Sequence, residues 1–263
     1  MMITRKYFSP PVFSLAFRPY WRRNFMMWKK LAVPSILGSL IEPLFYLLAL
    51  GFGLGSMLPS MEGIPYSTFV AGGIVCTVIL NSATAEVLHP CLTRMQTQKI
   101  WEAVMNTPLT LDDIVLGELL WAATKSTLSG VAMLAVIWLF GLFHEWTALW
   151  IIPMSFVIGL CFAGMGLAMT GFAARYDFFM FYFTLVITPM TLLGAVFFPI
   201  SRLPVFLQMF SSVLPLTHAI QLVRPVLHGQ APDHIWLHIA VLLAYGLIGF
   251  YVALAFMRRR LLK

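Results

Sequence analysis

The sequence lacks the charge density and the nucleotide-binding motifs that soluble ATP-using proteins need. Only 10% of its 263 residues are charged, whereas soluble domains carry about a quarter. The dipeptide Gly-Lys does not occur, so the Gly-x-x-x-x-Gly-Lys-Ser/Thr phosphate loop is absent. Zinc-enzyme and serine-nucleophile signatures are missing too. We therefore expect no enzyme activity and no cofactor in this chain, so any ATP and Mg²⁺ would belong to a partner subunit.

The three cysteines give no disulfide framework, and the amino-terminal segment gives no secretory signal. Cys76 and Cys161 lie inside apolar runs, and Cys91 falls in a segment that we place in the cytoplasm. All three are expected to be small buried hydrophobes. The first apolar run begins near Leu31, behind a basic leader and without a small-residue cleavage pattern. We expect this run to stay in the protein as a membrane span.

Long hydrophobic runs are what the sequence has in abundance. Hydrophobic residues make up 60% of the chain, and the mean hydropathy is +0.87. A bilayer core about 30 Å thick needs roughly 20 apolar residues in a helix. The predicted fold is an all-α integral membrane protein, in which a leader segment 1–30 precedes one transmembrane domain 31–263. Its six predicted transmembrane helices are 31–58, 68–88, 114–140, 148–173, 178–198 and 235–256.

Basic residues gather near both ends of the chain and predict its orientation. There are 17 Lys and Arg against 10 Asp and Glu, a net charge of +7. The leader contains no acid, and the tail carries consecutive arginines at 258–260. With both termini in the cytoplasm, most of the cations lie inside, as the positive-inside rule requires. We predict a multi-pass protein of the bacterial inner membrane, with lipids and not nucleic acid as the partner of these charges.

The second half of the leader has the pattern of an amphipathic helix. Aromatic side chains fall on one side of a helical wheel, and cations gather on another. This pattern is typical of an interfacial helix with aromatics inward and cations toward anionic lipid. The alternative is a plain positive-inside anchor. The predicted interfacial residues are Phe17, Arg18, Trp21, Arg22 and Trp28, with Phe13 and Tyr20 also on the aromatic side.

The connection between the second and third spans is the longest one predicted inside the cell. Its middle, 96–105, is expected to form a short helix that Pro108 ends. Thr110 and Asp113 have the spacing of a capping box that begins the third span. An exposed Trp101 between polar residues suits contact with a partner protein. The alternative is a tryptophan that dips into the lipid headgroups.

A carboxylate lies near the middle of the first span. At 1.5 Å per residue, Glu42 is close to mid-bilayer, where an ionised carboxylate costs on the order of 3 kcal/mol. It should therefore face a cavity or a partner, or be protonated. Pro43 frees a backbone carbonyl and predicts a kink. The alternative role for Glu42 is a structural hydrogen bond between helices.

The segment 199–233 is too long for a tight turn and too apolar for a soluble loop. Pro204, Pro215 and Pro225 divide it into pieces that we expect to be short re-entrant or interfacial helices at the outer face.

Two further pairings are considered in the spans. Lys125 is expected to make a structural pair with Glu86 or Glu118 near the cytoplasmic end. His234 and His238 have the i, i+4 spacing of metal ligands, but no clustered acids or cysteines complete a site. We therefore predict no metal.

Three stretches of the sequence resemble a known family. They are Glu-Pro-Leu-Phe-Tyr-Leu-Leu-Ala-Leu-Gly-Phe-Gly-Leu-Gly at 42–55, Trp-Glu-Ala-Val-Met-Asn-Thr-Pro at 101–108, and a proline-rich stretch between Phe197 and Pro225 that includes Leu-Pro-Leu-Thr-His at 214–218. Over nearly its whole length the chain resembles the type-2 ABC exporter permeases, and more specifically the NodJ-like permeases associated with lipooligosaccharide export.

The resemblance implies a permease subunit that moves a lipid-linked or amphipathic substrate, such as a lipooligosaccharide, a polysaccharide or a drug. It implies a homodimer of this chain joined to two copies of an ABC ATPase subunit. The helix between spans two and three would be the coupling helix, and substrate would pass between the protomers near spans one, two and five. The residues assigned on this basis are Ile100, Trp101, Glu102 and Met105 for coupling to the ATPase, and Glu42, Pro43 and Tyr46 for the transport path or its gating.

Two other functions fit parts of the sequence. An ion-coupled secondary transporter would use Glu42 as its proton carrier, but the chain lacks the paired broken helices and the internal duplication common in such folds. A membrane enzyme acting on lipid-linked sugars would need convergent titratable residues at one membrane face, and the sequence has only scattered ones.

Overall fold

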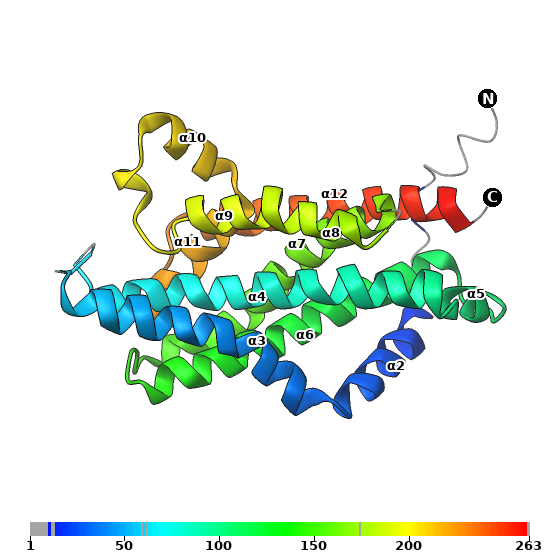
Figure 1. The fold of residues 1–263 in the computed structure, drawn as a ribbon, viewed down its shortest axis with the longest axis horizontal. Helices are drawn as coiled ribbons and strands as arrows, with labels where there is room; N and C mark the ends of the chain where they lie inside the picture. The colour runs from blue at the N-terminus through cyan, green and yellow to red at the C-terminus, as the bar shows by residue number, and fades with distance from the viewer. Residues whose placement is uncertain (1–9, 12–13, 59, 62, 174, 262–263) are drawn as a thin grey trace.

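The computed structural model describes residues 10–11, 14–58, 60–61, 63–173 and 175–261. Long helices such as α4 (Tyr66–Leu92) and α12 (Ile235–Leu261) run roughly along the long axis of the molecule (Figure 1). Phe13 and the first nine residues of the leader lie outside the described residues. The α-helices are α2 (Phe17–Lys29), α3 (Ala32–Tyr46), α4 (Tyr66–Leu92), α5 (Ile100–Met105), α6 (Leu111–Leu139), α7 (Ile151–Phe172), α8 (Asp177–Tyr182), α9 (Thr188–Leu193), α10 (Val205–Val213), α11 (Pro215–Leu227) and α12 (Ile235–Leu261). Short π-helical and 3-10 segments are η1 (Leu47–Gly53), η2 (Leu54–Ser56), η3 (Thr93–Thr97), η4 (Trp146–Trp150), η5 (Phe183–Ile187) and η6 (Ile200–Arg202).

Within the described residues, five helices are long and apolar enough to cross a membrane, and they confirm the predicted fold class. The predicted run 178–198 forms a shorter apolar helix, Asp177–Leu193, made of α8, η5 and α9. It is about 25 Å long at 1.5 Å per residue, which is somewhat less than a bilayer core. The five long helices are Ala32–Ser56, Tyr66–Thr97, Leu111–Leu139, Trp146–Phe172 and Ile235–Leu261.

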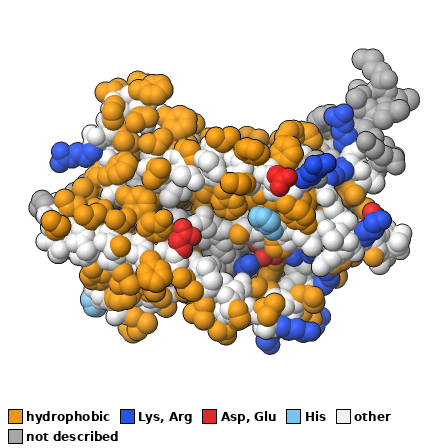
Figure 2. Space-filling model, viewed as in Figure 1, with side chains coloured by type: hydrophobic (Ala, Val, Ile, Leu, Met, Phe, Trp, Pro, Cys, Tyr) orange, Lys and Arg blue, Asp and Glu red, His pale blue; other side chains and the backbone are white. Residues whose placement is uncertain are grey.

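The two ends of the molecule differ in charge. One end, which we call the basic end, holds α5 and the end of α12, and Lys and Arg side chains gather there (Figure 1, Figure 2). The opposite end, which we call the hairpin end, holds α10 and α11, which meet at 84°. Pro204 and Pro215 precede or begin these two helices, as predicted, whereas Pro225 lies inside α11. The bend falls at Leu214, because a residue before proline avoids helical geometry.

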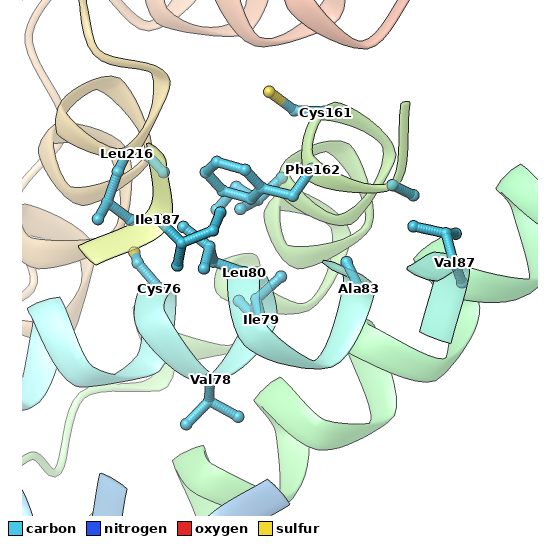
Figure 3. Packing of buried hydrophobic residues seen from close by; sticks show 14 of the residues in the cluster. Cys76, Val78, Ile79, Leu80, Ala83, Val87, Cys161, Phe162, Ile187 and Leu216 are labelled. Carbon is cyan, nitrogen blue, oxygen red and sulfur yellow. The ribbon is translucent and has the colours of Figure 1, made fainter. Parts of the chain in front are cut away.

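The core is built around α4, almost all of whose residues are buried. Phe162 of α7 and Leu216 of α11 point toward α4 in the packed cluster of Figure 3. Cys76, Cys91 and Cys161 are buried and unbonded, as predicted from their apolar surroundings. The central helix therefore contacts most of the other spans, and movement of α4 would be felt across the molecule.

Helices α7 and α12 approach each other at backbone distance through glycines. A Cβ atom at Gly164 would lie 2.3 Å from the carbonyl oxygen of Gly246, and one at Gly249 would lie 2.5 Å from the carbonyl carbon of Gly164. In lipid, helices associate largely through close van der Waals packing, which small residues permit. These glycines therefore fix the α7–α12 contact.

We predict that Gly164→Ala lowers the free energy of unfolding by about 1–3 kcal/mol, because its methyl group collides with backbone that cannot move aside. Thermal unfolding of the purified chain in detergent measures the effect. The matched control is Gly38→Ala in α3, where an added Cβ meets nothing within 4 Å. This control should be neutral or stabilising by up to about 1 kcal/mol. Equal unfolding temperatures for wild type and Gly164→Ala would contradict the packing argument.

Candidate functional site

A groove of about 400 Å³ opens between α3, α4 and the η5–α9 segment. Glu42, Pro43 and Tyr46 all line it, so the structure places the three residues assigned to the transport path in one groove. Hydrophobic side chains border a hollow on this face of the molecule, and an acidic side chain lies beside it (Figure 2). The other polar residues that line the groove are Thr77, Asn81, Thr188 and Thr191.

Glu42 and Asn81 bring unpaired polar groups to this groove. Glu42 is exposed, and no described residue bonds to its carboxylate or forms an ion pair with it. The alternative of a structural hydrogen bond between helices is therefore not supported among the described residues. Asn81 is half-buried, and its side chain has no hydrogen-bond partner among the described residues. Polar groups inside a membrane carry a desolvation cost unless they face water or a ligand, so the groove is the place where these two groups are solvated or bound.

Two π-helical segments border the groove. Segment η1 begins at Leu47, directly after Tyr46, and η5 contributes Phe183 and Ile187 to the lining. Pro189 follows η5 and has no amide N–H, so the carbonyl four residues earlier lacks its usual helical donor. Departures from α-helical geometry of this kind occur frequently at functional sites. The helices that border the groove therefore depart from regular α-helical geometry beside it.

A loop that Arg224 of α11 holds contributes Val196 and Phe197 to the lining of the groove. The Arg224 guanidinium donates to the carbonyl oxygen of Ala195 at 2.6 Å and to that of Phe69 at 3.2 Å. It also lies 3.6 Å from the centroid of the Phe69 ring. The Tyr66 hydroxyl donates to the Phe197 carbonyl at 3.1 Å. The loop after α9 is therefore fixed to the start of α4, with Ala195 in a left-handed conformation (φ 64°).

A second polar group, which we call the charge cluster, lies at the basic end and consists of Glu86, Arg94, Glu118 and Lys125. Lys125 Nζ lies 2.7 Å from Glu86, so the predicted pair forms with this carboxylate. Glu118 instead pairs with Arg94 at 2.6 Å, and Arg94 also reaches Glu86 at 3.3 Å. The helix formed by α4 and η3 continues to Thr97, past the predicted end of the second span at residue 88, and so carries Arg94 to these carboxylates.

The short helix after the second span is confirmed, although it begins later than predicted. α5 starts at Ile100, because Lys99 adopts a left-handed conformation (φ 50°) that turns the chain away from η3. It ends before Pro108, as expected. The predicted capping box of α6 is also confirmed, since Thr110 Oγ1 accepts from the Asp113 amide at 3.2 Å and Asp113 Oδ2 accepts from the Thr110 amide at 3.0 Å.

The expectation of an exposed Trp101 is wrong. Its side chain is 0% exposed and belongs to the hydrophobic core, so it neither projects toward a partner nor dips into the headgroups. The turn at Lys99 directs α5 back onto the chain, which explains this burial. Glu102 is exposed, and Ile100 and Met105 are partly buried. The surface that α5 offers is therefore made of Glu102, Ala103 and the partly exposed apolar side chains, and Trp101 anchors the helix from beneath.

Helix α2 is amphipathic, but its aromatic side packs on this chain. Arg18 and Arg22 are exposed, while Phe17, Trp21 and Trp28 are half-buried. Trp21 Nε1 donates to a threonine hydroxyl of α6 at 3.2 Å, and the Trp28 ring lies 5.8 Å from a tryptophan ring of α6. The position of α2 in the headgroup layer stays a prediction.

Besides the Arg94–Glu118 pair and the α7–α12 glycine contact, sequence analysis missed two further contacts. Asp112 at the start of α6 pairs with Arg258 near the end of α12 at 2.5 Å, and both side chains are buried. His238 Nδ1 lies 2.7 Å from His218 Nδ1 of α11, so its ring partner is not His234. The described residues contain no group of three or more His, Cys, Asp or Glu placed to hold a metal ion. In both contacts the partner comes from a distant helix, so local spacing gave no signal.

Comparison with known proteins gives consistent matches. The model of the family described as ABC-2 type transporter matches residues 16–228. Nodulation protein J of Rhizobium leguminosarum bv. viciae is 43% identical over 253 residues, covering 96% of this chain and 98% of that protein. Nodulation protein J of Sinorhizobium fredii is 44% identical over 244 residues, covering 92% and 93%. The inner membrane transport permease YadH of Escherichia coli is 24% identical over 212 residues, covering 80% and 81%.

We predict that Trp101→Ala lowers the free energy of unfolding by about 3–5 kcal/mol, because it leaves a large cavity in the core. Glu102→Ala, one residue away but exposed, should change it by no more than about 0.5 kcal/mol. Thermal unfolding of both purified variants in detergent measures the difference. A stable Trp101→Ala variant would show that the tryptophan is not part of the packed core.

Proposed function

Since the chain belongs to the ABC-2 type transporter family, we propose that it is the membrane permease subunit of an ATP-binding cassette exporter in the bacterial inner membrane. The family match across residues 16–228 is the observation that carries this proposal. ATP is hydrolysed by a separate subunit, because this sequence contains no phosphate loop. The chain itself supplies the path and the surface on which the ATPase acts.

The ATPase binds at the basic end, on the surface of α5. Glu102 and Ala103 are exposed on α5, and Asn106 is exposed directly after it, so the surface offers both polar and small apolar groups to a partner. α5 is fixed from beneath by the buried Trp101. A force applied to its surface is therefore passed to the spans and not absorbed by a loose loop. We place this end in the cytoplasm because the cations gather there.

Substrate follows the groove between α3, α4 and the η5–α9 segment, which a second copy of the chain covers. An apolar stripe at four-residue intervals runs along the exposed side of α3: Val33, Leu37, Ile41 and Phe45, each 54–68% exposed. Side chains at this spacing form a ridge that packs into the groove of a second helix, which here belongs to the other protomer. The homodimer then encloses the path between two equivalent grooves.

The groove suits an amphipathic substrate. Its walls are mostly apolar and include Tyr46 and Phe183, while Glu42 and Asn81 offer an acceptor and a donor to a polar head. A lipooligosaccharide-like molecule has both parts, and polysaccharides or drugs are the other classes to consider. Glu42 and Asn81 bind hydroxyl or amine groups of the head as it passes.

The second candidate function is ion-coupled transport with Glu42 as the proton carrier. The unpaired carboxylate in the groove is the observation that favours it. Membership of the ABC-2 family favours ATP as the energy source instead.

We predict that Glu102→Lys weakens binding of the ATPase subunit. The tagged chain is purified from its native membrane, and the ATPase that co-purifies is identified and quantified by mass spectrometry. Reversal of a charge in a protein contact costs several kcal/mol, so recovery should fall at least tenfold, with the unfolding temperature unchanged.

The matched control is Glu145→Lys, the same charge reversal on an exposed acid outside α5. This variant should recover the ATPase as well as wild type does. If no ATPase co-purifies with the wild-type chain, or if both variants lose it equally, the proposed contact is wrong.

We predict that Glu42→Gln slows ATP-driven movement of a fluorescent short-chain glycolipid in inverted membrane vesicles by roughly tenfold, as expected for loss of one hydrogen bond to a charged group. The ATPase should still co-purify with this variant. A glycolipid flux that a proton gradient drives without ATP, and that Glu42→Gln abolishes, would favour the ion-coupled alternative.

A further inference from the structure

The Glu118 carboxylate joins three segments of the chain at one point. It lies on α6, and its side chain is 0% exposed. From η3 it accepts two hydrogen bonds from Arg94, at 2.8 Å from Nε and 2.6 Å from Nη2. From α2 it accepts one from the Tyr20 hydroxyl at 2.7 Å and one from Asn24 Nδ2 at 3.3 Å. One carboxylate thus holds both the segment before α5 and the leader helix.

The remaining members of the charge cluster fix Arg94 from the other side. Glu86 of α4 accepts from Lys125 Nζ at 2.7 Å, from Trp121 Nε1 at 2.9 Å and from Arg94 Nη2 at 3.3 Å. The two carboxylates and the two cations balance in charge. Arg94 therefore lies between two buried acids and has little freedom to move away from either.

Tyr20 and Asn24 are the two buried residues of α2, and the chain makes room for them. A Cβ atom at Gly117 would lie 2.8 Å from Tyr20 Cδ1, so the glycine permits the tyrosine to enter. Burial, followed by the nearby Glu118 charge, raises the pKa of the Tyr20 hydroxyl. Tyr20 therefore keeps its proton and acts as a donor to Glu118 at neutral pH.

Movement of either α2 or η3 away from α6 would leave the buried Glu118 carboxylate without some of its hydrogen-bond donors. Removal of a partner from a buried carboxylate destabilises the protein far more than the breaking of an ion pair at the surface does. α5 follows Arg94 after a short turn and is anchored by Trp101. Motion of α5 alone is therefore costly, whereas motion of α5 together with α2 and the part of α6 that carries Glu118 keeps every hydrogen bond to this carboxylate.

We infer that Glu118, Tyr20 and Asn24 are positioning residues that lock α2 and η3 to α6 around Glu118, so that these segments move with α5 as one body. The inference rests on the proposed function only for the source of the displacement, which is the ATPase acting on α5. The leader helix α2 then follows each movement of α5. The lock itself is a property of this chain alone.

Hydrogen–deuterium exchange of the purified full chain in nanodiscs tests the lock. Tyr20→Phe removes one donor and keeps the ring, and Glu118→Gln removes the charge and keeps the shape. In both variants, amide exchange should rise together in residues 17–29 and 93–105, on the order of tenfold, as expected for loss of a hydrogen bond to a charged group. Exchange in α7 and the middle of α12 should stay as in wild type.

The matched control is Asp112→Asn, which weakens a buried ion pair of similar length that ties α6 to α12. It should raise exchange in residues 250–261 and leave 93–105 unchanged. Exchange that rises in only one of the two segments, or evenly over the whole chain, would overturn the inference. Because this experiment needs no ATPase, failure of the ATPase to bind would contradict the proposed function and leave the lock untouched.

Discussion

The low dielectric of the bilayer dictates where this chain keeps its charges. The described charges that lie deep in the structure at the basic end are paired, in the charge cluster and in the Asp112–Arg258 pair. An unpaired charge at these positions would carry a large desolvation cost. The pairs therefore decide which helices meet. Glu118 brings α2 and η3 to α6, and Arg258 brings the end of α12 to the start of α6. The hydrophobic core around α4 fills the space between them.

The cost of an unpaired charge in low dielectric also applies to Glu42, which differs from the acids at the basic end. It lies in a groove of about 400 Å³, and no described residue pairs with it. A chain that satisfies its other intramembrane acids so completely has no structural need for this one, so its cost is better explained by function. With the π-helical segments η1 and η5 beside it, the groove is a part of the spans where regular α-helical geometry is interrupted. In an ABC-2 type transporter such a groove suits the path of a substrate.

Local rules predicted the features of the fold that depend on local sequence. The apolar runs, the divisions at Pro204 and Pro215 and the capping box of Thr110 follow from neighbouring residues, and the structure has them. For Glu42 the general rule about carboxylates in lipid left a cavity, a partner or protonation open, and the structure places this residue in a groove.

Features that depend on distant contacts were missed. The burial of Trp101 depends on a left-handed turn at Lys99. Lysine rarely adopts this conformation, so the sequence does not predict the turn. The partner of Glu118 and the glycine contact between α7 and α12 depend on which helices lie side by side. No spacing within a single helix carries that information.

The proposed function requires the basic end, with α5, to face the cytoplasm. The most direct test is labelling of single cysteines in intact spheroplasts with a membrane-impermeant maleimide, since the three native cysteines are buried. Asn106→Cys beside α5 and Ser201→Cys near the hairpin end both place the thiol at an exposed position. We expect Ser201→Cys to be labelled from outside and Asn106→Cys only after the membrane is opened. Labelling of Asn106→Cys in intact spheroplasts would contradict the orientation on which ATP-driven export depends.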